Sequence, residues 1–351
     1  MIEAKLWFAL IAIMFAVYVA LDGFDFGAGI LHLFVAKTDE ERRSVLAAIG
    51  PVWDGNEVWL IAGGGTLVFA FPRVYAAGFS GFYLPLMMAL WLLILRGISI
   101  EFRSHEAHPL WRSFWDGVFF LSSSLMAVIL GAALGNVIRG VPINSSGYFS
   151  GPLFTNFVPG RNPGVLDWYT VTVGLFALFA LALHGAFYLN LKTEGAVQER
   201  SRAIAKKLCS AVLLLGILVT IATNYVQPAL YTHLIDRPWT WILALIIVAG
   251  MFMMPAGCRK KNDMLSFLGS TALLIGMLAA TAAGEFPVLL TSTISPEYNL
   301  TVTNASTGAH GLTVGLIWWI PAAIIAGFYF FYLFRLYRGK VSSDIKSLSS
   351  Y

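Results

Sequence analysis

The stretch Pro51–Gly65, which reads PVWDGNEVWLIAGGG, opens an apolar run that continues to Phe71. An apolar run of about 20 residues is long enough to cross the hydrocarbon core of a bilayer. This run nevertheless carries two carboxylates, Asp54 and Glu57, three residues apart. Each charged side chain near a membrane centre costs about 2.5–3.5 kcal/mol on insertion scales, so both acids require a physical reason.

The composition of the whole chain places it among membrane proteins. Of its 351 residues, 58% are hydrophobic and only 12% are charged, and the mean hydropathy is +0.74. Soluble domains contain about 25% charged residues. The composition therefore predicts an all-α polytopic membrane protein, folded as one helical bundle. The two cysteines, Cys209 and Cys258, lack the spacing of a metal site or disulfide framework.

Hydropathy predicts nine transmembrane helices in a single domain that covers residues 1–351. Of the 23 Lys and Arg residues, 18 fall in the connections on one side of these helices. The positive-inside rule therefore predicts an outside N-terminus and a cytoplasmic C-terminus, and it explains the net charge of +4 without a nucleic-acid partner. The predicted spans are roughly 6–34, 52–71, 76–99, 114–138, 166–190, 207–226, 239–257, 264–284 and 312–334.

With this topology, the depth of each residue in the membrane can be inferred from its position in a span. Asp22 and Asp25 lie past the middle of the first span, on one helical face because they are three residues apart. Asp54 and Glu57 lie at the cytoplasmic end of the second span. The charges gathered in the inner half of the first four spans are Asp22, Asp25, Asp54, Glu57, Arg96 and Asp116. Such a cluster suits a proton half-channel that opens to the cytoplasm.

Two structural explanations compete with a proton path. Asp54 and Glu57 also fit a capping box, in which Asp54 is the N-cap of the second span and Glu57 folds back on it. Asp22 and Asp25 could instead be plain salt-bridge partners of Arg96 within the bundle. The sequence leaves both alternatives open.

Small residues near these acids predict close helix packing. Gly23 and Gly27 form a small-xxx-small face on the first span, and Gly63 and Gly64 offer the same in the second. The sequence does not say whether the partner helix belongs to this chain or to another.

Histidine placement argues against a haem held by this chain alone. Bis-histidine ligation needs two buried imidazoles that face one cavity. Only His184 lies well inside a predicted span, while His32 lies at the inner end of one. We expect His184 to be a hydrogen-bonded core histidine.

The first third of the chain contains several longer strings of residues that together form a specific pattern. The strings are DGFDFGAG at 22–29, GPVWDGNEVWL at 50–60, FPRVYA at 71–76, FSGFY at 79–83, LRG at 95–97 and EFR at 101–103. With these strings the chain resembles subunit II of the bd-type cytochrome quinol oxidases of bacteria and archaea. The resemblance is close over the first third, whereas the rest of the chain matches in hydropathy and span count.

The resemblance implies a nine-helix subunit that pairs with a haem-bearing subunit I. That partner would carry two haems b and one haem d, oxidise quinol and reduce O2 to water with protons drawn from the cytoplasm, without pumping. No cofactor would be ligated by this chain alone. The resemblance also admits a structural quinone, phospholipid and a small single-span third subunit as partners.

Matching positions imply roles for individual residues. Asp54 corresponds to the aspartate at the start of a proton path, and Asp25 to an intramembrane acid beside that route. Trp59 corresponds to a tryptophan near a proposed oxygen-access tunnel. Glu57 is Gln in some relatives, which questions an essential role on the path, and Arg96 is expected to neutralise the acids.

A function of a different class is a secondary transporter with proton-coupling acids in its first two spans. Transporters of that kind usually have related halves with broken helices in corresponding positions. Here the acids come early and spans five to nine are nearly free of charge. The sequence therefore favours the oxidase subunit.

Overall fold

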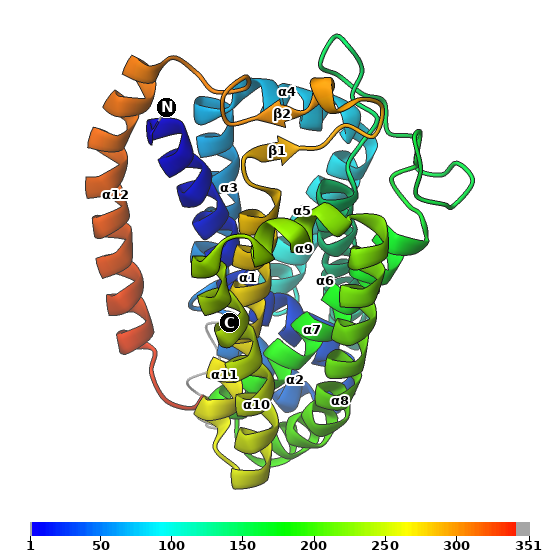
Figure 1. Ribbon diagram of the computed structural model, residues 1–351. Helices are drawn as coiled ribbons and strands as arrows, with labels where there is room; N and C mark the ends of the chain where they lie inside the picture. Colours follow the sequence, from blue (N-terminus) through cyan, green and yellow to red (C-terminus); the bar gives the residue numbers. More distant parts are fainter. Residues whose placement is uncertain (1, 342–351) are drawn as a thin grey trace.

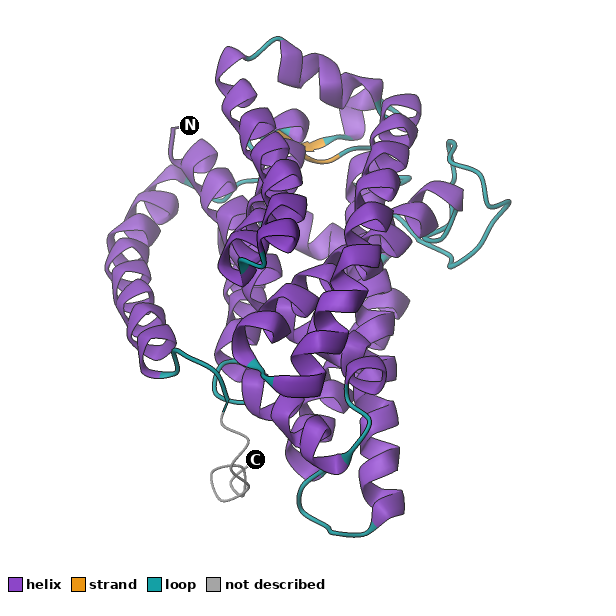
Figure 2. Ribbon diagram, turned by 90° about the horizontal axis from the view of Figure 1, so that it is seen from below, coloured by secondary structure: helices purple, strands orange, loops and turns teal. Residues whose placement is uncertain are grey.

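The apolar runs form long helices that lie side by side, as Figure 1 shows for the computed structural model, which describes residues 2–341. Helices make up most of this part of the chain, and its only strands form one short hairpin (Figure 2). The helices are α1 (Ile2–Val35), α2 (Asp39–Ile49), α3 (Trp53–Ala70), α4 (Pro72–Gly81), α5 (Tyr83–Phe102), α6 (Pro109–Arg139), α7 (Trp168–Lys192), α8 (Gly195–Val226), α9 (Pro228–Ile235), α10 (Trp241–Lys260), α11 (Asp263–Glu285) and α12 (Ala309–Leu336).

The two ends of the bundle differ. One end carries β1 (Val288–Leu290) and β2 (Leu300–Thr301), an antiparallel pair in which Val288 faces Thr301. Figure 1 places this hairpin and α4 at the opposite end from α2. The two ends are called the hairpin end and the α2 end below.

Within residues 2–341, eight helices are long and apolar enough to cross a membrane. A ninth crossing is obtained if α3 is counted together with α4, to which it is joined by a 120° bend. The prediction of an all-α polytopic membrane protein is thus confirmed.

The third predicted span, 76–99, begins in the wrong place. Residues 72–81 form the separate helix α4, and the crossing helix α5 starts at Tyr83. Pro72 is the first residue of α4, and proline disfavours helical geometry in the residue before it. Phe71 accordingly has φ −134° and ψ 65°, which ends α3 and turns the chain across the bundle.

The helix that carries the sixth predicted span, 207–226, begins twelve residues before that span. Helix α8 starts at Gly195, so a basic segment predicted as a loop is helical. Two ion pairs hold this first part of α8 at the α2 end: Arg200 with Glu41 at 2.7 Å, and Arg202 with Asp263 at 2.5 Å. Hydropathy alone could not detect a helix that is stabilised by charges.

The core is centred on α1 and α7, which cross at glycines. A Cβ atom on Gly27 would lie 2.1 Å from the carbonyl oxygen of Leu181 and 2.6 Å from the Cα of Gly185. Only glycine permits this approach, so α1 is fixed against α7 through backbone contact. Helix α12 lies at the edge of the bundle beside α1 (Figure 1), and its most apolar window contains no buried residue.

Candidate functional site

Arg96 occupies the junction of α1, α3 and α5 and is fully buried. Its guanidinium donates hydrogen bonds of 2.6 and 3.0 Å to the two oxygens of Asp22, and one of 3.0 Å to Glu57. The same group lies 4.0 Å from the ring centre of Phe26. A forked cation and a carboxylate that pair in this bidentate way satisfy each other's charge inside low-dielectric surroundings.

Asp25 lies one helical turn further along α1, and it too is fully buried. Among residues 2–341 its side chain has no ion-pair partner and a single hydrogen-bond partner, Asn56 on α3, whose Nδ2 donates to Oδ2 at 2.8 Å. The other oxygen of Asp25 and the amide oxygen of Asn56 are buried without a partner in the same part of the chain. Asp25 is therefore an acid that the nearby cation does not neutralise.

The charge balance of this junction is negative. The junction holds one guanidinium, that of Arg96, and three carboxyl groups: Asp22 and Glu57, which it bonds, and Asp25, which it does not bond. Ionising all three would leave uncompensated charge in a buried site, which is costly. An arrangement of this kind can take up a proton and release it again.

Asp54 does not cap α3. The N-cap is Val52, no side-chain capping bond is formed, and Asp54 is the second residue of the helix. Its carboxylate is exposed on the surface of the chain. Glu57 bonds Arg96 rather than folding back, so the capping-box alternative is wrong. The salt-bridge alternative holds for Asp22 but not for Asp25.

Trp59 follows the acids on α3 and is partly buried. Its ring lies 5.6 Å from that of Phe330 on α12. A Cβ on Gly55 would lie 3.7 Å from the same phenylalanine, which places α12 directly beside the acid-bearing end of α3.

The predicted packing glycines behave differently from one another. Gly23 and Gly27 contact α7, and Gly63 faces the ring of Phe15 on α1, with 2.9 Å to an added Cβ. Gly64 has no atom within 4 Å of an added Cβ. Gly64 therefore makes no close packing contact of its own among the described residues.

A second charged cluster lies at the α2 end, where Asp116 on α6 is almost fully buried. It accepts bonds of 2.6 Å from His32, 2.6 Å from Arg103 and 2.7 Å from Arg42. The sequence indicated Asp116 and His32 at similar depth, but it did not indicate that they pair. One carboxylate thus joins α1, α2 and α6 to Arg103, the residue that follows α5.

Acids of α2 extend this cluster outward. Partial burial by itself raises the pKa of Asp39, but hydrogen bonds and charge from Arg103 and Arg112 outweigh it and leave that pKa lowered. A hydrogen bond from Arg200 likewise lowers the pKa of Glu41. Both carboxylates are thus kept ionised by the positive charge and hydrogen bonds of the neighbouring arginines.

His184 is a satisfied core histidine, as predicted. One ring nitrogen lies 2.7 Å from the hydroxyl of Ser270 and the other 2.9 Å from the carbonyl oxygen of Ala20. The ring stacks on Phe267 at 4.9 Å. Both nitrogens are engaged, so His184 offers no axial ligand to a haem.

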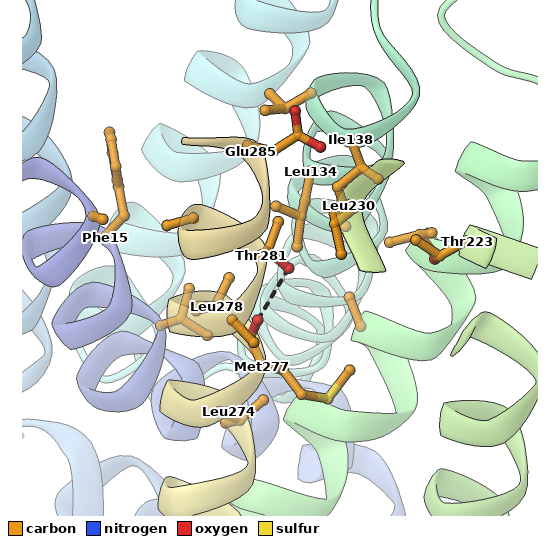
Figure 3. A pocket seen from close by; sticks show the side chains of 18 of the residues that line it. Phe15, Leu134, Ile138, Thr223, Leu230, Leu274, Met277, Leu278, Thr281 and Glu285 are labelled. Carbon is orange, nitrogen blue, oxygen red and sulfur yellow. Dashed lines mark hydrogen bonds between the residues drawn. The ribbon is translucent and has the colours of Figure 1, made fainter. Parts of the chain in front are cut away.

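A cavity of about 960 Å³ opens among the helices towards the hairpin end (Figure 3). Its walls are almost entirely apolar, and Leu134, Leu230 and Leu278 are typical of them. Glu285 is its single acidic residue. One oxygen of Glu285 accepts a 3.4 Å bond from Thr291, and the other is buried without a partner among residues 2–341.

Comparison with known proteins identifies a family. A family model described as cytochrome bd terminal oxidase subunit II matches residues 4–337. Cytochrome bd ubiquinol oxidase subunit 2 of Bacillus subtilis is 32% identical over 337 residues, which cover 94% of this chain and 95% of that protein. Cytochrome bd-I ubiquinol oxidase subunit 2 of Escherichia coli K12 is 29% identical, over 91% of this chain and 89% of its own.

A solved structure has the same fold. The bd oxidase from Geobacillus thermodenitrificans contains a chain that superimposes with a TM-score of 0.75 at 18% sequence identity. The superposition covers 96% of this chain and 99% of that one. At this level of identity the likeness concerns the fold alone.

Proposed function

The chain belongs to the family of cytochrome bd terminal oxidase subunit II, and from this premise we propose that it supplies protons to the haem-bearing subunit. As a member, it is an integral inner-membrane subunit of a quinol oxidase and assembles with a partner, subunit I. None of the relatives supports the alternative of a secondary transporter.

The proposed path uses the acids of α1 and α3. Asp54 is exposed at the first turn of α3, where it can collect a proton. Glu57 lies on the same helix face one turn further on, bonded to Arg96, and Asp25 lies inside the bundle. The observation that carries the proposal is that Asp25 is buried with no cation beside it and one oxygen unpaired.

In this scheme Asp25 holds the proton and Arg96 keeps the surroundings in balance. Arg96 is bound to Asp22 through both of its oxygens, so that pair contributes no mobile proton. Protonation of Asp25 removes one negative charge from the junction, and release of the proton restores it. A carboxyl group that gains and loses a proton in this way can act as an intermediate proton carrier on the path.

The α2 end is proposed to be cytoplasmic. The positive-inside rule assigns the side with 18 of the 23 Lys and Arg residues to the cytoplasm. Arg42, Arg103 and Arg200 lie on that side. The N-terminus is then outside, and protons enter at Asp54 from the cytoplasm.

Subunit I is proposed to dock on the face formed by α3, α5 and α12. Asp54 is exposed on this face, and an ionised carboxylate facing lipid at a helix end is unfavourable unless protein or water covers it. The same helices carry large exposed apolar side chains, including Ile61 on α3 at 70% and Trp91 on α5 at 63% exposure. A partner seated here would receive protons directly from the acid cluster and would also cover Trp59, the proposed wall of an oxygen-access route.

Haem is a cofactor of the complex, and we propose that two haems b and one haem d lie in the partner. His184 does not fit a haem ligand, because both of its ring nitrogens are already hydrogen-bonded. No step of the mechanism in this chain involves that group.

A structural quinone is proposed to occupy the apolar cavity, whose volume of about 960 Å³ suits an isoprenoid chain. Phospholipid would cover the outward apolar faces. A small single-span third subunit is a further proposed partner.

The proposed path is tested with an Asp54→Asn variant of the assembled oxidase. Removing a positioned proton carrier should lower turnover by about 100-fold or more, while haem content stays normal. An Asp236→Asn variant is the matched control, because Asp236 is an exposed acid that follows α9 near the hairpin end. Native turnover per haem in Asp54→Asn would reject the path through this residue.

A further inference from the structure

We propose that Asn56 is a positioning residue that holds Asp25 for proton transfer, an inference that rests on the proton-access function above. Asn56 is fully buried on α3, between the exposed Asp54 and the Arg96-bound Glu57. The sequence placed it within a motif but gave it no role.

The amide of Asn56 holds α1 at two points. Its Nδ2 donates to Asp25 Oδ2 at 2.8 Å and approaches the carbonyl oxygen of Leu21 at 3.4 Å. Leu21 precedes Asp25 by one helical turn, so the same group contacts the backbone and the carboxyl. This double contact fixes which oxygen of Asp25 is occupied.

Because Asn56 occupies Oδ2, the exchanging proton is assigned to Oδ1, the other oxygen of Asp25. Asp25 Oδ1 and Asn56 Oδ1 are both buried acceptors without a donor among the described residues. A buried acceptor of this kind is satisfied only by a donor, and a water molecule can donate to either oxygen, while a proton on Asp25 turns its own oxygen into a donor. When Asp25 releases its proton, its O–H bond breaks, an O–H bond forms on a water molecule, and the carboxylate keeps the N–H of Asn56.

A neutral amide suits this task better than a cation would. Arg96 is already bonded to Asp22 and Glu57, and a guanidinium beside Asp25 would trap the ionised form. The amide donates to the carboxyl in either protonation state. Asn56 therefore orients the acid without preventing it from taking up a proton again.

The test replaces Asn56 by Leu in the assembled oxidase, which keeps the approximate volume and removes the donor. Turnover per haem should fall about tenfold or more, with the KM for quinol and the haem content unchanged. An Asn56→Ser variant, which retains a hydroxyl donor, should be faster than Asn56→Leu. If Asn56→Leu does not assemble, Asn56→Ala takes its place with the same expectation.

A double variant separates positioning from packing. Because Asn56 acts through Asp25, adding Asn56→Leu to Asp25→Asn should cause no further loss of turnover. Native turnover per haem in the Leu or Ala variant, or additive losses in the double variant, would overturn the inference. Native turnover in Asp25→Asn alone would reject the proposed proton path itself, whereas a slow Asp25→Asn beside a normal Asn56→Leu rejects only the role of Asn56.

Discussion

Replacing Arg96 by Met tests whether the junction of α1, α3 and α5 depends on its ion pair. Arg96 donates two bonds to Asp22 and one to Glu57, and both Arg96 and Asp22 are fully buried. Removing the cation leaves the carboxylate of Asp22 unpaired inside the bundle. Breaking a buried pair from one side costs about 3–5 kcal/mol.

The compensating change is Asp22→Leu in the same chain. A buried ion pair replaced by apolar residues of similar size is often neutral for stability, so the double variant Arg96→Met/Asp22→Leu should regain most of the loss. The assay is thermal denaturation of the purified complex, followed by release of haem. The single variant should lose several degrees in midpoint. A single variant as stable as the native complex, or a double variant less stable than the single one, would refute the reasoning.

Two further predictions concern packing and pH. A Gly27→Leu variant should fail to assemble, because even its Cβ would lie 2.1 Å from the carbonyl oxygen of Leu181. Gly64→Ala is the control and should leave the fold of this chain intact, because the space around Gly64 is open. The amount of each variant in the membrane is measured by immunoblot, and a normal amount of Gly27→Leu would contradict the helix crossing. The pKa of Asp39 is lowered beside Arg103, so the ionised carboxylate stabilises the folded chain at pH values above the unfolded pKa of about 3.9. This stabilisation is lost as the pH falls through the lower pKa of the folded state. The melting temperature of the complex should therefore depend less on pH between about pH 5 and 3 in Asp39→Asn, and an identical pH dependence would contradict the role of Asp39.

The sequence predicted the helical class, and it assigned Asp22, Glu57 and Arg96, which the structure brings together, to one depth, although it also grouped Asp116 with them, which lies in a separate cluster. These features follow from hydropathy and from the cost of charge in lipid, which are both local properties of the chain. The grouping of Asp22 with Arg96 also followed, since both were assigned to the same depth. Trp59, Asp25 and Asp54 were assigned roles by resemblance, and these remain proposals.

What the sequence missed depends on contacts between distant segments. Asn56 is an uncharged residue in a charged motif, and only the approach of α3 to α1 reveals that it bonds Asp25. The geometry of proline predicts the bend at Pro72, but the segments on both sides are apolar, so hydropathy gives no sign of a break between them. The first turns of α8 contact the α2 end through Arg200 and its partner Glu41, which are 159 residues apart.

Proton uptake by an Asp25→Asn variant tests the central claim most directly. The reduced oxidase, reconstituted in liposomes, is mixed with O2 while a pH-sensitive dye reports uptake on the side of the α2 end. We predict that uptake is slowed about 100-fold or more relative to the native complex, although quinol still reduces the haems and haem content is normal. Uptake at the native rate from that side would contradict the account.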